Sequence, residues 1–132
     1  MIYLDSCALV KLVSPAPETV ALERFLRGRA DEHHVASALV RTEVRRALYR
    51  VGATARQRST ADKLLDAVIT ISITDDLLDA AGQLPEPGLR SLDAIHLATA
   101  LHLGTGLSEF VTYDRRLLAA AKHAGLSTAA PH

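Results

Sequence analysis

The chain has 132 residues and a mass of 14.2 kDa, which suits one domain, and 48% of the residues are hydrophobic, which is enough for a core. Basic and acidic residues both number 15, so bulk charge gives no reason to expect nucleic-acid binding, and any basic surface must be local. The single cysteine excludes an internal disulfide. Because we find no signal peptide and no long apolar run, we expect one cytoplasmic domain over residues 1–132 that binds no membrane.

Strand-like and helix-like segments alternate along the chain, and most strand-like segments end where a helix begins. In chain order the pattern predicts a strand at 2–4, helices at 8–13 and 18–29, a strand at 34–36, a helix from the N-cap Ser37 to Gly52, a helix at 54–67, a strand at 68–73, helices from 75 and at 92–103, a strand at 110–113, and a helix at 115–123. This order favours an α/β fold with a parallel sheet of four or five strands, flanked by helices on both faces and joined by right-handed crossovers.

Four carboxylates stand where a strand-like run ends or where a helix opens. They are Asp5, Glu43, Asp93 and Asp114. Ligands of open α/β sheets bind outside the carboxyl ends of the strands, so acids placed there by separate units can converge. Two carboxylates about 4 Å apart repel by roughly 4 kcal/mol at an effective dielectric of about 20, so the group needs a counter-charge. Hard oxygen ligands without thiolates or paired histidines favour magnesium or manganese over zinc.

Two of the acids also have an ordinary structural explanation, and the other two do not. Asp93 and Asp114 can serve as helix caps, because the helix macrodipole favours a carboxylate at the N-terminus. Asp5 ends an apolar strand, where burial of an unpaired charge is costly. Glu43 is expected in the second turn of its helix, where it has no capping role, and on the rim of the apolar stripe. His96 follows Asp93 by one turn, but no cysteine or further histidine completes a zinc set, so a site role is not the favoured interpretation.

Positive charge is expected beside the acids. Arg46 and Arg50 follow Glu43 by one and two helical turns on the same side of the helix, covering about 10 Å of its length. A phosphate backbone can follow such a track. Arg115 comes directly after Asp114 and can reach the mouth of the acidic crevice. Plain solubility, or a surface for a partner protein, remains the alternative for these arginines.

The segments IYLDSCALVKL, SALVRTEVRRAL, LRSLDAIHLATAL and FVTYDRRLLAAA carry the four acids in order. With these motifs the chain, over essentially its whole length, resembles the PIN-domain ribonucleases, specifically the VapC toxins of VapBC toxin–antitoxin systems. The resemblance implies that the four acids bind magnesium or manganese. It also implies that Ser6 and Thr112 orient a carboxylate or a metal-bound water. A homodimer, an RNA substrate and a cognate VapB-type antitoxin are expected on the same ground.

The activity expected is metal-assisted hydrolysis of RNA phosphodiesters with one or two divalent ions. A phospho-acceptor receiver domain is an alternative of similar length, with a parallel sheet and an acidic crevice. That alternative requires adjacent acids after the first strand, an acceptor aspartate after the third strand and a lysine after the last strand. This chain has the single acid Asp5 at the first place, Thr74 at the second and Asp114 at the third. A second alternative is a non-catalytic PIN-like binding partner, against which the intact set of four acids argues.

Overall fold

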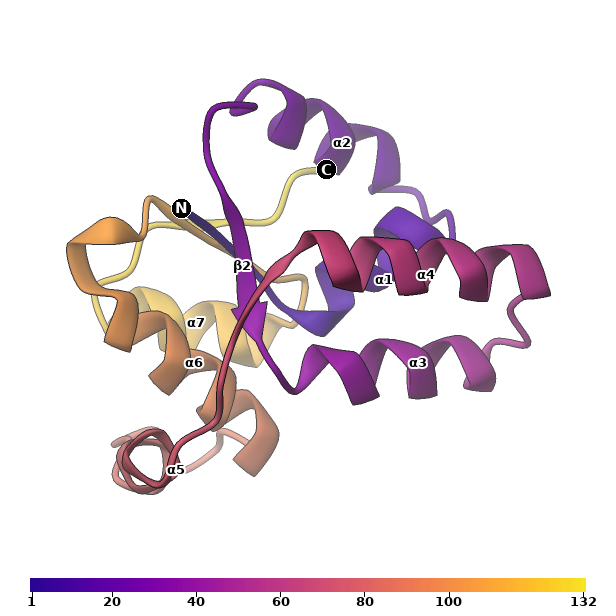
Figure 1. Ribbon diagram of the computed structural model, residues 1–132. Helices are drawn as coiled ribbons and strands as arrows, with labels where there is room; N and C mark the ends of the chain where they lie inside the picture. The colour runs from indigo at the N-terminus through magenta and orange to yellow at the C-terminus, as the bar shows by residue number, and fades with distance from the viewer.

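A short apolar strand of residues 2–4 lies in the middle of the fold, and a five-stranded, entirely parallel sheet is built around it. Figure 1 shows helices on both sides of this sheet. The computed structural model describes residues 1–132. Its elements in chain order are β1 (Ile2–Leu4), α1 (Ser6–Val13), α2 (Thr19–Arg27), β2 (His34–Ser37), α3 (Val40–Arg50), α4 (Ala55–Ala67), β3 (Ile69–Ile71), α5 (Asp75–Gly82), α6 (Ser91–Leu103), the 3-10 turn η1 (Gly104–Gly106), β4 (Glu109–Val111), α7 (Arg115–His123) and β5 (Thr128–Ala129). The predicted fold class is confirmed.

The strands lie in the order β3-β2-β1-β4-β5, so the chain builds the sheet outward from β1 in one direction and then in the other. Ile2 pairs with His34 of β2 on one side and with Glu109 of β4 on the other. Reversal of the strand order between β1 and β4 creates a switch point at the carboxyl ends of these strands. Any crevice at that edge therefore lies beside the residues that follow β1 and β4. None of the helices combines the length and the apolar character needed to cross a membrane.

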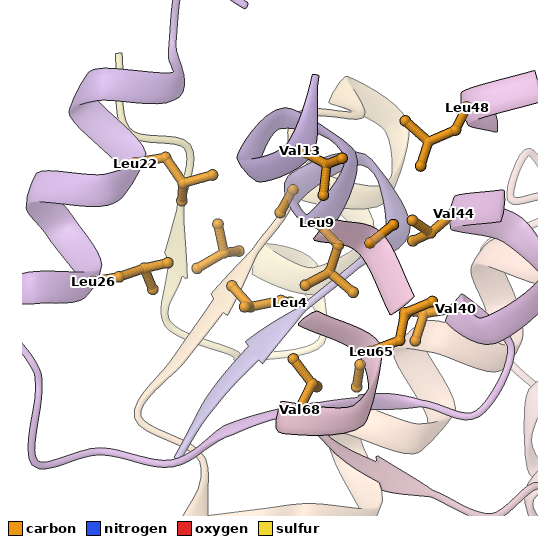
Figure 2. Packing of buried hydrophobic residues seen from close by; sticks show 14 of the residues in the cluster. Leu4, Leu9, Val13, Leu22, Leu26, Val40, Val44, Leu48, Leu65 and Val68 are labelled. Carbon is orange, nitrogen blue, oxygen red and sulfur yellow. The ribbon is translucent and has the colours of Figure 1, made fainter. Parts of the chain in front are cut away.

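Alternation of side chains along β1 separates the two layers of the core, because successive residues of a strand point to opposite faces. Ile2 and Leu4 pack with helices α1 to α4, where Leu9, Val44 and Leu65 belong to the same buried cluster (Figure 2). The side chain in between, Tyr3, packs on the other face with β2, β4, α6 and α7. All three side chains of β1 are fully buried. Helices thus cover both faces of the sheet, as the alternation of segments predicts.

The start of α3 differs from the prediction. Ser37 is the last residue of β2 rather than the N-cap of a helix, and the N-cap is Leu39, which makes no side-chain capping bond. The backbone N–H of Ser37 donates to the hydroxyl of Tyr3, and the pairing of β2 with β3 extends to Ser37, so this residue is held in the sheet. As a result α3 begins at Val40 and Glu43 lies in its first turn, not its second.

The segment predicted as a strand over 68–73 forms only the three-residue edge strand β3. Val68 is the C-cap of α4, and Thr74 is the N-cap of α5, with its hydroxyl accepting the N–H of Leu77. β3 is short because its only neighbour, β2, gives way to α3 after Ser37. At the opposite edge the two-residue strand β5 adds a fifth strand that is too short to be recognised from a sequence pattern.

Candidate active site at the carboxyl edge of the sheet

Asp5 follows the central strand β1 and serves as the N-cap of α1. One oxygen, Oδ1, accepts the N–H of Ala8 at 2.9 Å, and the other, Oδ2, accepts the hydroxyl hydrogen of Thr112, which lies just past β4. Only 2% of Asp5 is exposed. A buried carboxylate needs such partners, because an ion without hydrogen bonds is strongly disfavoured away from water.

Burial also changes the acidity of Asp5. The pKa of its carboxyl group is raised from 3.8 to about 6, mainly by removal from water and to a smaller extent by the negative charge of Glu43. The hydrogen bonds from Thr112 and Ala8 and the charge of protonated His96 act in the opposite direction. Asp5 therefore gains or loses its proton in the mildly acidic pH range, much closer to pH 7 than an exposed aspartate does.

Asp114 occupies the equivalent position after β4. Its Oδ1 accepts the N–H of Leu117 at 2.8 Å and so caps α7, which confirms that Asp114 has a capping role. The backbone N–H of Asp114 donates to the hydroxyl oxygen of Thr112 at 3.1 Å. Since the same hydroxyl donates to Asp5, Thr112 links the acids that follow β1 and β4.

Glu43 reaches the same edge from α3 and meets a histidine of α6. Its Oε1 lies 2.6 Å from Nε2 of His96, and the other ring nitrogen of His96, Nδ1, lies 2.7 Å from the hydroxyl of Tyr3. His96 is 1% exposed, whereas 20% of the Glu43 side chain is exposed. The sequence alone does not favour a site role for His96, and its spacing of three residues from Asp93 is the one signal that points to it.

Asp93 lies in the first turn of α6, half-buried, and its side chain makes no hydrogen bond or ion pair. Its pKa is raised, first by partial burial and then by the charge of Asp114, while His96 lowers it. The charge of the acid that follows β4 therefore disfavours the ionised form of this acid of α6.

The negative charges of all four acids act on Cys7. The pKa of its thiol is raised to about 12, first by partial removal of the sulfur from water and then by these charges. In decreasing order of effect the acids are Asp5, Asp114, Asp93 and Glu43. Acids from four separate parts of the chain therefore add negative charge near the first turn of α1.

A cavity of about 870 Å³ opens beside these acids. Glu43 and Asp114 line it together with Ser6, and so do Arg46 and Arg50, whose side chains are exposed one and two turns further along α3. The structure therefore brings both arginines to the same wall as Glu43, as the helical spacing predicts. Arg115 is exposed on α7 but does not line this cavity, so its predicted place at the crevice mouth is not seen.

Carboxylate oxygens are suitable ligands for a hard divalent cation, but in this structure they are oriented toward hydrogen-bond donors of the protein. No group of three or more acidic, histidine or cysteine side chains is placed to hold one metal ion. Asp5, Glu43 and Asp114 instead accept hydrogen bonds from the protein. An ionised carboxylate has about four lone-pair sites, so each of them keeps free acceptor positions. The donor set fits magnesium or manganese better than zinc.

The chain is similar to known proteins over almost its whole length. The family described as "PIN domain" matches residues 2–123. Ribonuclease VapC46 of Mycobacterium tuberculosis (strain ATCC 25618 / H37Rv) is 46% identical over 130 residues, which cover 98% of this chain and 97% of that protein. Ribonuclease VapC47 of Mycobacterium tuberculosis (strain CDC 1551 / Oshkosh) is 39% identical over 133 residues, covering 99% and 97%.

Solved structures agree with this fold. The Mycobacterium tuberculosis toxin VapC20, described as cleaving the sarcin-ricin loop, superposes with a TM-score of 0.76 at 19% identity, covering 99% of this chain and all of that one. The protein PAE2754 of Pyrobaculum aerophilum superposes with a TM-score of 0.63 at 23% identity, covering 96% and 89%. At such low identity the likeness concerns the fold alone.

Proposed function

This chain belongs to the PIN-domain family, and from this membership we propose that it is an endoribonuclease that acts as the toxin of a type II toxin–antitoxin system. Support comes from the VapC ribonucleases, which are 38–46% identical and match it over nearly their whole length. The family assignment leaves the receiver-domain alternative without support.

The catalytic site we propose is the group of four carboxylates, with magnesium or manganese as cofactor. Asp5 and Asp93 would be the firmest ligands, with Glu43 and Asp114 completing the set. The observation that supports this proposal is that Thr112 links Asp5 to Asp114 at the carboxyl edge of the sheet, while Glu43 and Asp114 line one cavity there. A divalent ion held there would offset the clustered negative charge, activate a water and stabilise charge on the phosphate.

Two hydroxyl residues would support the carboxylates. Thr112 already donates to Asp5 and accepts from the backbone of Asp114, which limits the orientations that both acids can take. Ser6 lines the cavity directly after Asp5, where its hydroxyl would orient a bound water.

The RNA would lie along the cavity wall formed by α3. Arg46 and Arg50 are exposed there beside Glu43, and guanidinium groups bind phosphate oxygens well. We assign the phosphate contacts next to the acids to this pair. Arg115 does not line the cavity, so we propose that it contacts a part of the RNA that lies outside the cavity.

Two protein partners are proposed with the activity. The VapC name of the relatives implies a VapB-type antitoxin, and the same resemblance implies a homodimer. Light scattering on the purified chain, alone and with the antitoxin, tests both assemblies.

The test of the proposed function is cleavage of single-stranded RNA with Mg²⁺, with Mn²⁺ and with a chelator. The wild-type chain should cut RNA only with metal, and Asp5→Asn should not cut under any condition. Asp79→Asn, an exposed acid of α5, is the matched control and should retain full activity. Binding without cleavage by the wild type would favour the non-catalytic alternative, and full activity of Asp5→Asn would reject the site.

A further inference from the structure

A chain of buried polar groups leads from the sheet to Glu43. The backbone N–H of Ser37 in β2 donates to the hydroxyl of Tyr3 in β1 at 3.1 Å. That hydroxyl lies 2.7 Å from Nδ1 of His96 in α6, and Nε2 of His96 lies 2.6 Å from Oε1 of Glu43 in α3. Tyr3 is fully buried and His96 nearly so. Four elements therefore contribute to one connected set of hydrogen bonds.

The carboxylate at the end of this chain determines the direction of its bond to His96. A carboxylate oxygen can only accept, so Nε2 of His96, 2.6 Å from Oε1 of Glu43, carries a proton and donates. On the other side of the ring, the hydroxyl of Tyr3 accepts from the N–H of Ser37 and can donate to Nδ1 of a neutral imidazole. A neutral imidazole that accepts at one nitrogen carries its proton on the other. The ring of His96 is therefore in the Nε2–H form and donates to Oε1 of Glu43.

Packing holds both rings of this chain in place. Tyr3 stacks on Phe110 of β4 with ring centroids 5.0 Å apart and an interplanar angle of 10°. The ring of His96 meets the edge of Tyr3 at a centroid distance of 5.9 Å and an angle of 82°. Since neither ring has room to rotate freely in a packed core, the donor aimed at Glu43 is fixed before any ligand arrives.

We propose that His96 is a positioning residue of the nuclease site: its Nε2–H holds Oε1 of Glu43 and leaves the rest of that carboxylate turned toward the cavity. This inference rests on the proposed function, because it gives Glu43 its orientation as a ligand. A free glutamate side chain must be ordered when it binds a metal, whereas a side chain held by a histidine is ordered in advance. Removal of such a supporting hydrogen bond typically weakens metal binding or activity by about 10–100-fold.

Three variants separate the hydrogen bond from the bulk of the side chain. Asn at position 96 can still accept from Tyr3 but does not reach Glu43, whereas Gln reaches about as far as Nε2 of histidine and can donate. His96→Asn should therefore lose about 10–100-fold in Mn²⁺ affinity by calorimetry and in kcat, and His96→Gln should recover most of both. His102→Asn, an exposed histidine of the same helix, is the control and should match the wild type.

The ¹⁵N chemical shifts of the His96 ring in the metal-free wild-type protein provide a second measurement. This measurement depends neither on activity nor on whether a variant folds. In ¹⁵N NMR, His96 should be the Nε2–H tautomer at neutral pH. A ring without a proton on Nε2 would overturn the proposal, because it has no hydrogen to donate to Glu43. So would a folded His96→Asn that binds Mn²⁺ as tightly as the wild type. A wild type that cuts no RNA would instead reject the proposed function, and the NMR result would still decide the orientation of the bond to Glu43.

Discussion

Thr112 and Asp5 lie 107 residues apart in the chain and are joined by a hydrogen bond between their side chains at the carboxyl edge of the sheet. Thr112 is fully buried and Asp5 is 2% exposed. The bond favours the ionised form of Asp5, but burial has the larger effect and the pKa of this carboxyl group rises to about 6. Ionised Asp5 is therefore a destabilising group that the fold retains, as expected of a functional residue.

Asp5→Asn should stabilise the metal-free protein at pH 7. Between pH 4 and pH 6 the folded state holds a proton on Asp5 that the unfolded state has lost, so the free energy of unfolding falls as pH rises through this window. A rise in pKa from 3.8 to about 6 corresponds to about 3 kcal/mol. We expect the variant to be about 1–3 kcal/mol more stable than the wild type at pH 7 and no more stable at pH 4, measured by urea unfolding.

Thr112→Val should have the opposite effect on stability from Asp5→Asn. It keeps the shape of the side chain but leaves Oδ2 of Asp5 and the backbone N–H of Asp114 without their hydrogen-bond partner, so stability at pH 7 should fall by about 1–3 kcal/mol. Stabilisation by Thr112→Val, or a pH-independent effect of Asp5→Asn, would contradict this description of Asp5.

Metal binding should tighten as pH rises. Protons compete with the metal for Asp5, whose pKa is raised to about 6, and for Asp93, whose pKa is also raised. Below about pH 6 the Mn²⁺ affinity should therefore increase by up to about tenfold per pH unit and then level off near pH 7. Calorimetric titrations at several pH values measure this, and an affinity that is flat from pH 4 to pH 7 would count against these carboxylates as ligands.

Replacing Arg46 and Arg50 together with alanine should weaken RNA binding at low salt and make it less dependent on salt. Each lost phosphate contact on single-stranded RNA lowers the slope of log affinity against log salt by about 0.7. Base preference should hardly change. The control is the pair Arg24→Ala and Arg56→Ala, which are exposed on α2 and α4, away from the cavity. If oligomer size changes while RNA affinity per site does not, these arginines belong to a protein interface instead.

Tyr3→Phe should destabilise the fold by about 1–3 kcal/mol, because the ring still stacks on Phe110 while the buried N–H of Ser37 loses its acceptor. Tyr113→Phe is the comparison, since its hydroxyl donates to the carbonyl of Pro131 in a partly buried position and its loss should cost about 0.5–1.5 kcal/mol. Chemical unfolding of both variants measures the difference. Equal effects would show that the buried chain of hydrogen bonds has no special importance for stability.

Cys7 should react slowly with iodoacetamide, although the residue is exposed. The thiolate is the reactive form, and partial removal of the sulfur from water, together with the charges of the acids, raises the pKa of this thiol to about 12. Asp114→Asn should speed the reaction, because it removes one of these charges. Added Mg²⁺ should also speed it if the ion binds among the acids. A rate equal to that of a free cysteine in the unfolded chain would contradict the convergence of the four acids.

Much of the fold follows from local chemistry that is written in the sequence. The caps made by Asp5, Thr54 and Asp114 each bind an N–H three residues ahead, so they depend on neighbours along the chain alone. Apolar segments that end at such caps predict strands followed by helices, and this order predicts the parallel sheet. The four acids were identified because each lies at such a junction or near a helix start, where a sheet of this kind forms its crevice.

The tertiary structure decided the contacts between elements. Three features depend on which elements become neighbours. They are the hydrogen bond from Ser37 to Tyr3, which keeps Ser37 in the sheet and not at a helix start, the hydrogen bond between His96 and Glu43, and the short length of β3. A one-dimensional pattern shows which face of an element is apolar but not which side chain of another element meets it. The sequence therefore determined where the acids enter the fold, and only packing of α3, α6 and β1 against one another decided how one of them, Glu43, is held.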